Sequence, residues 1–184
     1  TGWISYSLSR TNYKFGDLNQ GNYFIPRHNR TSVVNAVFNT NLSHLFSSKP
    51  DPRATTNWNF SASFVYASGQ PITVPSSAYY SSTVPDWNFL ENPNTFNPEY
   101  HLYPSKINAF QLPDYIRLDL SITWEKQYDG WSLAPYFQVF NIGNRGNVWF
   151  IEYEDELADG RIVQKAEKVN MLPLLPSLGV TIKF

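Results

Sequence analysis

Residues 116–124 read Ile-Arg-Leu-Asp-Leu-Ser-Ile-Thr-Trp, so that apolar and polar side chains alternate throughout the stretch. Successive side chains of a β-strand point to opposite faces, and this alternation therefore predicts a strand with two different surroundings. Together with its flanks the stretch reaches the roughly 9–11 residues with which a tilted strand crosses a bilayer. Strands of soluble sheets are usually shorter, about 5–6 residues.

Five further stretches carry the same alternation and predict five more strands. They lie at 4–9, 33–42, 57–66, 131–141 and 177–184. Because a shift of one residue would exchange the two faces, the pattern also predicts which side chains share the apolar face. We expect this face to contact lipid and its intervening neighbours to face a polar lumen. The predicted apolar set is Ile4, Tyr6, Leu8, Val34, Phe38, Trp58, Phe60, Phe64, Leu118, Leu120, Ile122, Leu178, Val180 and Ile182.

The composition excludes several classes of protein. Aromatic residues make up 17% of the chain and charged residues only 16%, against roughly 25% charged in soluble domains. No apolar run approaches the 18 residues of a transmembrane helix. A net charge of −1 gives no basic patch for nucleic acid, and the absence of Cys excludes disulfides, thiolate metal sites and a cysteine nucleophile.

An antiparallel sandwich with one face in water is the alternative fold, and three features favour a membrane barrel instead. The polar face carries mostly Ser, Thr and Asn, as in a wet lumen. Aromatic residues stand at the strand ends, where interfacial girdles fall in barrels. Short connections (43–56 and 125–130) alternate with long ones (14–31, 68–114 and 143–173), as periplasmic turns alternate with extracellular loops.

Six strands are too few to close a barrel, since bacterial barrels have about eight or more. We therefore expect the chain to be a wall segment that needs partner strands. The strand pattern is already present at the first residues, so we expect the start at Thr1 to be a cut within a longer protein.

Five stretches, in this order and spacing, resemble the C-terminal barrel of TonB-dependent outer-membrane receptors, particularly those of Bacteroidota. The stretch Asn22–Arg30 matches only in part, because the order Arg27-His28-Asn29-Arg30 departs from the order of these residue types in the family. The stretches are Tyr66–Thr73 (YASGQPIT), Leu112–Leu120 (LPDYIRLDL), Phe137–Asn144 (FQVFNIGN), Leu175–Phe184 (LPSLGVTIKF) and Asn22–Arg30 (NYFIPRHNR).

The resemblance implies an all-β fold: an antiparallel transmembrane β-barrel segment of about six strands, the C-terminal part of a roughly 22-stranded barrel, over residues 1–184. It implies energised import of an iron chelate, cobalamin, an oligosaccharide or a peptide across the bacterial outer membrane, without catalysis or cofactor. The implied partners are outer-membrane lipid, an N-terminal plug, the remaining strands, the TonB complex and a surface lipoprotein. The alternatives are a non-transporting outer-membrane barrel and a soluble carbohydrate-binding β-sandwich.

Candidate site residues fall into two groups. Arg117 and Asp119 share the polar face of one predicted strand. There they either line the substrate path or hold the plug, or they pair with each other or with neighbouring strands across the wall. Aromatic residues in the connection 76–113 suit stacking on sugar rings or capture of an apolar ligand. These ligand-binding candidates are Tyr79, Tyr80, Trp87, Phe89, Tyr100 and Tyr103.

Two other groups of residues are weaker candidates. The histidines at 28, 44 and 101 lie far apart and predict no metal site. The acidic run Glu152, Glu154, Asp155 and Glu156 is interpreted as a solvated loop face or, less favourably, as a cation site.

Overall fold

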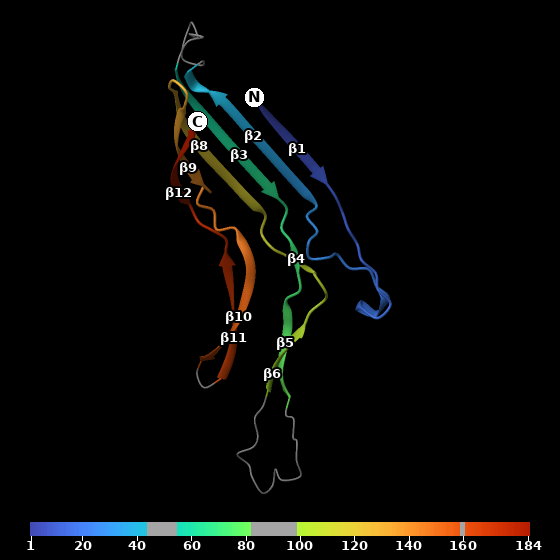
Figure 1. Cartoon of the computed structure of the whole chain (residues 1–184). Helices are drawn as coiled ribbons and strands as arrows, with labels where there is room; N and C mark the ends of the chain where they lie inside the picture. The colour runs from blue at the N-terminus through green and yellow to red at the C-terminus, as the bar shows by residue number, and fades with distance from the viewer. Residues whose placement is uncertain (44–54, 82–98, 159–160) are drawn as a thin grey trace, which may run out of the picture. The chain divides into compact units, whose positions relative to one another are not determined.

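The computed structural model describes residues 1–43, 55–81, 99–158 and 161–184, which fold largely into antiparallel β-structure (Figure 1). The chain divides into two compact units. The first comprises residues 1–9, 30–69 and 113–184, and the second comprises residues 10–29 and 70–112. Within the described ranges, no helix is both long and apolar enough to cross a membrane.

One six-stranded sheet dominates the first unit. Each strand pairs antiparallel with the next, in the order β1-β2-β3-β8-β9-β12. The six predicted strands are thereby confirmed. The last strand pairs with the fifth. The sheet is open, with β1 and β12 as its edges, and no sheet in the described part of the chain closes into a barrel. The strands are β1 (Gly2–Leu8), β2 (Ser32–Asn41), β3 (Thr56–Ala67), β8 (Tyr115–Gln127), β9 (Ser132–Phe140) and β12 (Leu175–Lys183).

The register places every side chain of the predicted apolar set on one face of this sheet. Tyr6 lies opposite Val34, which lies opposite Tyr66 on the next strand. The same row-by-row matching continues from β3 through β8 and β9 to β12. Directly opposite residues share a face in an antiparallel ladder, so the alternation of the sequence becomes one continuous apolar surface. Lys126, near the end of β8, is the one charged side chain on this face of the six strands, all of which are described.

Aromatic side chains stand near both ends of the apolar face. Trp58 lies opposite Trp124 at the end where the short connections run. Tyr66 and Tyr6 stand at the other end, where the long connections leave the sheet. The eight steps from Trp58 to Tyr66 span roughly 26 Å along the strand at about 3.3 Å per residue. After strand tilt this is of the same order as the apolar band, about 25 Å tall, of membrane barrels.

The turn between β8 and β9 confirms the short connection predicted there. Gly130 has φ +78°, a left-handed conformation that glycine adopts without strain. The rings of Tyr128 and Trp131 stack with centroids 4.3 Å apart. The other predicted short connection contains residues 44–54, which lie outside the described part of the chain.

Treating the long connections as loops was wrong, since two of them contain strands. In the first unit, β10 (Val148–Ala158) and β11 (Arg161–Asn170) form a hairpin. The sequence Asp159-Gly160 between them is a strong hairpin signal that the acidic run obscured. In the second unit, short ladders join β4 (Pro71–Ile72) to β7 (Phe110–Gln111) and β5 (Pro75–Ser81) to β6 (Glu99–Pro104).

The second unit also holds the segment 10–29, which contains the short 3-10 helix η1 (Asn19–Gly21). Tyr13 and Phe24 form a β-bridge, and their rings meet edge to face with centroids 6.2 Å apart. The amide of Asn108 donates a 2.8 Å hydrogen bond to the carbonyl of Ile25, which fixes this segment to the connection 70–112.

Gly179 on the edge strand β12 provides a test of this packing. A Cβ atom at this position would overlap the ring of Tyr136, which lies across it from β9. Gly179→Ala should therefore lower the free energy of unfolding by about 1–3 kcal/mol, as overpacking does elsewhere. Chemical denaturation of the folded protein measures the change.

Gly143→Ala is the matched control, because nothing lies within 4 Å of a Cβ atom there. In a Tyr136→Ser background Gly179→Ala should cost much less. An unchanged cost in that background would show that the ring does not cover Gly179.

Candidate functional site

Polar side chains gather at the end of the six-stranded sheet where the long connections leave. Asp114, just before β8, accepts hydrogen bonds from the hydroxyl of Tyr66 (3.0 Å) and the backbone N–H of Gly69 (2.9 Å). Arg30, just before β2, donates to the carbonyl of Ser68 at 2.9 Å. These contacts join the ends of β2, β3 and β8 through groups that a strand ladder alone would leave unpaired.

Asn141 joins the end of β9 to both neighbouring strands. It is only 1% exposed and adopts a left-handed conformation (φ 51°), which asparagine tolerates better than most residues. Its backbone N–H donates to Asp119 at 2.9 Å. Its amide nitrogen donates to the carbonyls of Arg145 (3.0 Å) and Leu172 (3.2 Å), the latter just before β12.

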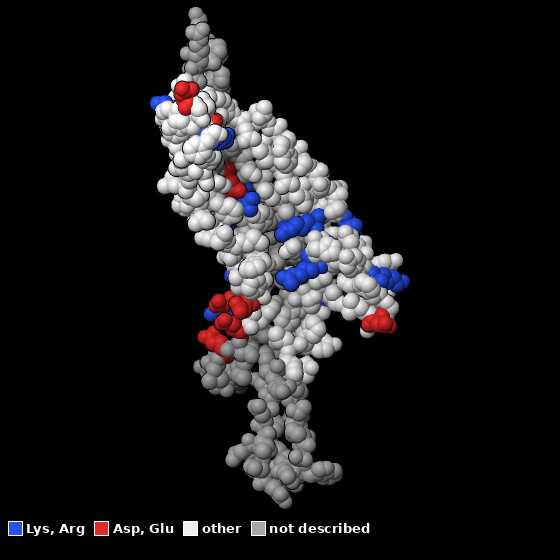
Figure 2. Space-filling view, viewed as in Figure 1, with Lys and Arg blue, Asp and Glu red and all other residues white. Residues whose placement is uncertain are grey.

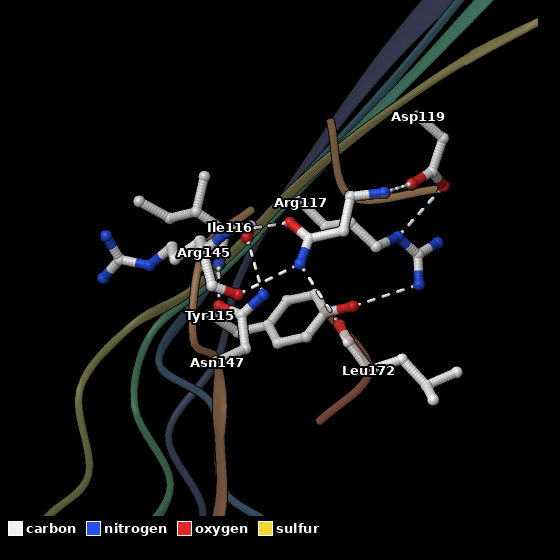
Figure 3. Close-up of polar contacts among 8 residues, drawn as sticks. Tyr115, Ile116, Arg117, Asp119, Arg145, Asn147 and Leu172 are labelled. Atoms are coloured by element: carbon white, nitrogen blue, oxygen red, sulfur yellow. Dashed lines mark hydrogen bonds and ion pairs between the residues drawn. The ribbon is translucent and has the colours of Figure 1, made fainter. Parts of the chain in front are cut away.

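Asn147 substitutes for a strand neighbour of β8 beyond the end of β9. Its side-chain oxygen accepts from the N–H of Ile116 at 3.0 Å, and its side-chain nitrogen donates to the carbonyl of Ile116 at 2.8 Å (Figure 3). These are the two backbone groups that would otherwise face an open sheet edge. Its own carbonyl accepts from Met171 at 2.8 Å, and this bond also fixes the base of the β10–β11 hairpin.

Arg117 and Asp119 pair with each other, as one of the two interpretations of the sequence predicts. Nε of Arg117 lies 3.0 Å from Oδ2 of Asp119, although the buried Nε makes no aligned hydrogen bond. One terminal nitrogen donates to the hydroxyl of Tyr115 at 3.0 Å (Figure 3). The guanidinium lies 4.6 Å from the ring centroid of Phe140. The charge of Arg117 is thus balanced by one carboxylate and held over an aromatic face.

A cavity of about 420 Å³ opens beside this ion pair, on the polar face. Side chains from β8, β9 and both strands of the β10–β11 hairpin reach it. The lining residues are Tyr115, Arg117, Phe140, Asn147, Trp149, Asn170, Met171 and Leu172.

The aromatic ligand candidates of the connection 76–113 are placed only in part. Tyr79 and Tyr103 are about half exposed on the same side of the β5–β6 hairpin, and the ring of Tyr79 lies 5.4 Å from that of His101. The backbones of Tyr80 and Tyr100 lie opposite each other in the same hairpin. Trp87 and Phe89 lie outside the described residues. Ligand contact by these residues stays a prediction.

The acidic run lies on a strand rather than on a loop. Glu152 and Glu154 of β10 face Glu167 and Lys165 of β11. A hydrogen bond from Lys165 lowers the pKa of Glu167 and raises the pKa of Lys165. Acidic side chains gather over this hairpin, whereas most of the surface over β1 to β3 in the same view is uncharged (Figure 2). No group of three or more His, Cys, Asp or Glu among the described residues could hold a metal ion.

Asp114, Asn141 and Asn147 were not singled out from the sequence. Asp114 and Asn141 do stand in the quoted stretches Leu112–Leu120 and Phe137–Asn144, where Asn-Ile-Gly-Asn after a strand signals a turn. Asn147 carries no such signal, because its partner is the backbone of a residue 31 positions away.

No family model matches the chain, and neither a curated protein nor a solved structure matches it.

The bonds of Asn147 yield a stability prediction. Asn147→Ala removes two buried hydrogen bonds and leaves both backbone groups of Ile116 without them, so it should cost about 2–3 kcal/mol of unfolding free energy. Asn147→Asp should cost at least as much at neutral pH, because an oxygen would then face the Ile116 carbonyl. Denaturation measures both.

Asn35→Ala changes the same residue type in the middle of the polar face of β2 and serves as the control. If Asn147→Asp were as stable as the unsubstituted protein, the amide would not hold Ile116 in the manner described.

Proposed function

We propose that the chain forms part of the wall of an outer-membrane β-barrel, with its apolar face in lipid and its polar face toward a lumen. The observation that supports this proposal is the single continuous apolar face across six neighbouring antiparallel strands. Five of these strands have 9–13 residues, as the crossing of a bilayer requires. The proposed location is therefore the bacterial outer membrane.

The uncovered apolar face is energetically costly in water. Ile4, Leu8 and Leu178 are 78%, 70% and 81% exposed, and Tyr6, Phe38 and Val180 are more than half exposed. Covering such a side chain completely is worth about 1.5–3 kcal/mol. For these six together the gain is on the order of 5–10 kcal/mol, as large as the net stability of many domains. Lipid covers such a face without a second protein layer.

The open edges support further strands beside β1 and β12. Backbone N–H and C=O groups without partners cost several kcal/mol each in hydrocarbon, so a sheet in a bilayer must continue until it closes. Both edge strands belong to the same apolar face as the interior strands. We infer that additional strands pair with both edges and complete the barrel.

Active import of a nutrient in the manner of TonB-dependent receptors is the function we propose for the complete barrel, with no enzymatic activity. The support is that four stretches resembling that family meet at one end of the sheet. Tyr66 and Gly69 bind Asp114, and Arg30 binds Ser68. Asn141, from the third stretch, donates a 2.9 Å hydrogen bond to Asp119 in the second. The plug, the TonB complex and a surface lipoprotein would be its partners.

The two faces can be tested by cysteine labelling, since the chain contains no Cys. Single substitutions Phe60→Cys and Leu120→Cys should react with a lipid-confined probe in bilayers, because their side chains lie on the apolar face. The adjacent substitutions Ser61→Cys and Asp119→Cys should react with a water-soluble probe instead. Preferential lipid-side modification at 61 and 119 would contradict the proposal, and labelling of all four by the soluble probe would favour a soluble sandwich.

A charge placed on each face gives an energetic test. Leu120→Arg should destabilise the folded protein by about 2–4 kcal/mol if residue 120 lies near the bilayer midplane. Thr123→Arg, on the polar face, should be much milder because its charge stays hydrated. Reversible unfolding from lipid vesicles measures the change in unfolding free energy for both variants. Equal changes at the two positions would contradict the proposal that the sheet has one face in lipid and the other in water.

A further inference from the structure

We propose that the cavity beside Arg117 is a binding site for an uncharged aromatic group that carries a hydrogen-bond-accepting oxygen. The cavity belongs to the first unit, and its volume of about 420 Å³ lies within the roughly 300–1,000 Å³ of small-molecule sites. The geometry of the cavity stands independently of membrane location. Its role as a contact for a transported molecule rests on the proposed function.

The apolar part of the lining favours an aromatic ring. Tyr115, Phe140 and Trp149 contribute three ring systems from three different strands, and Met171 adds a thioether beside them. Aromatic rings pack edge to face or offset against one another, and a thioether sulfur adds a favourable contact at the edge of a ring. The side chain of Trp149 is 58% exposed, so an incoming ring could cover it.

The polar part of the lining supplies donors for an oxygen atom. One terminal nitrogen of Arg117 is bonded to Tyr115, while the other has no hydrogen-bond partner among the described residues. Nearby, the exposed residue Asn170 also lines the cavity and carries a side-chain amide. Asn147 also lines the cavity, but both polar atoms of its amide are already bonded to Ile116. A carbonyl or hydroxyl oxygen on the ligand would accept from Arg117 or Asn170.

Charge balance favours a neutral ligand over an anion. Asp119 lies 3.0 Å from Nε of Arg117, so the two charges already offset each other at the cavity. The remaining charged side chains on the polar face of the six strands are Glu125 and Lys183, whose charged atoms lie 3.9 Å apart. These strands are entirely described, and their polar face therefore carries two positive and two negative charges. An anion would gain no net Coulomb attraction from this wall.

The single methionine of the chain provides a direct readout. The chain has one Met, at position 171, so methyl-13C-methionine labelling gives one methionine resonance from the cavity itself. An aromatic ring bound beside Met171 must shift this resonance through its ring current. We would titrate the detergent-solubilised full chain with benzamide, benzoate, cyclohexanecarboxamide and glucose. Its strand-type circular dichroism spectrum would serve as the folding control.

Benzamide should shift the Met171 signal saturably, with a Kd on the order of millimolar for so small a ligand. Trp149→Ala should weaken this binding about tenfold through loss of a ring contact. Trp3→Ala, which removes another half-exposed tryptophan of the polar face, should leave it unchanged. Cyclohexanecarboxamide and benzoate should both bind more weakly than benzamide.

Absence of a saturable shift with benzamide would overturn the proposal, and so would equal binding to Trp149→Ala. Tighter binding of benzoate or of glucose would overturn the assigned ligand class. None of these results depends on which face contacts lipid, whereas the cysteine labelling does. A failure of the site and a failure of the proposed membrane location are therefore distinguishable.

Discussion

The antiparallel pairing of the six strands from β1 to β12 is the constraint on which the other features depend. Since side chains alternate between faces, its register decides at once which residues form the apolar surface and which form the polar one. A slip of one residue on β8 would exchange Leu120 with Asp119 and place the ion pair of Arg117 on the apolar side. Register therefore links the strand pattern, the proposed lipid contact and the cavity.

The network at the end of the sheet keeps that register where the ladder stops. β9 ends at Phe140, whereas β8 begins at Tyr115, so the first residues of β8 lack a neighbouring strand on that side. Asn141 and Asn147 fill this gap with side-chain and turn hydrogen bonds. The same turn leads into the β10–β11 hairpin, which lines the cavity. Hydrogen bonds on the edge of β8 therefore position Trp149 and Met171 beside Arg117.

How far the sequence predicts this structure differs between the sheet and the site. Period-two alternation predicted all six strands and their faces, because each strand carries the signal within its own residues. The spacing of Arg117 and Asp119, two residues apart on one strand, predicted that they share the polar face, and their pairing was one of two interpretations of it. The β10–β11 hairpin was missed because charged residues occupy alternating strand positions. Asn147 was missed because its role depends on where β9 ends relative to Ile116, which no local pattern encodes.

Lipid contact of the apolar face is the central claim, and fluorescence quenching tests it most directly. Trp58 and Trp124 face each other on that surface, and replacing Trp3, Trp87, Trp131 and Trp149 by Phe leaves them as the only tryptophans. In vesicles, lipids brominated on their acyl chains should quench this variant strongly, and aqueous iodide should quench it weakly. Strong quenching by iodide together with insensitivity to brominated lipid would contradict the account.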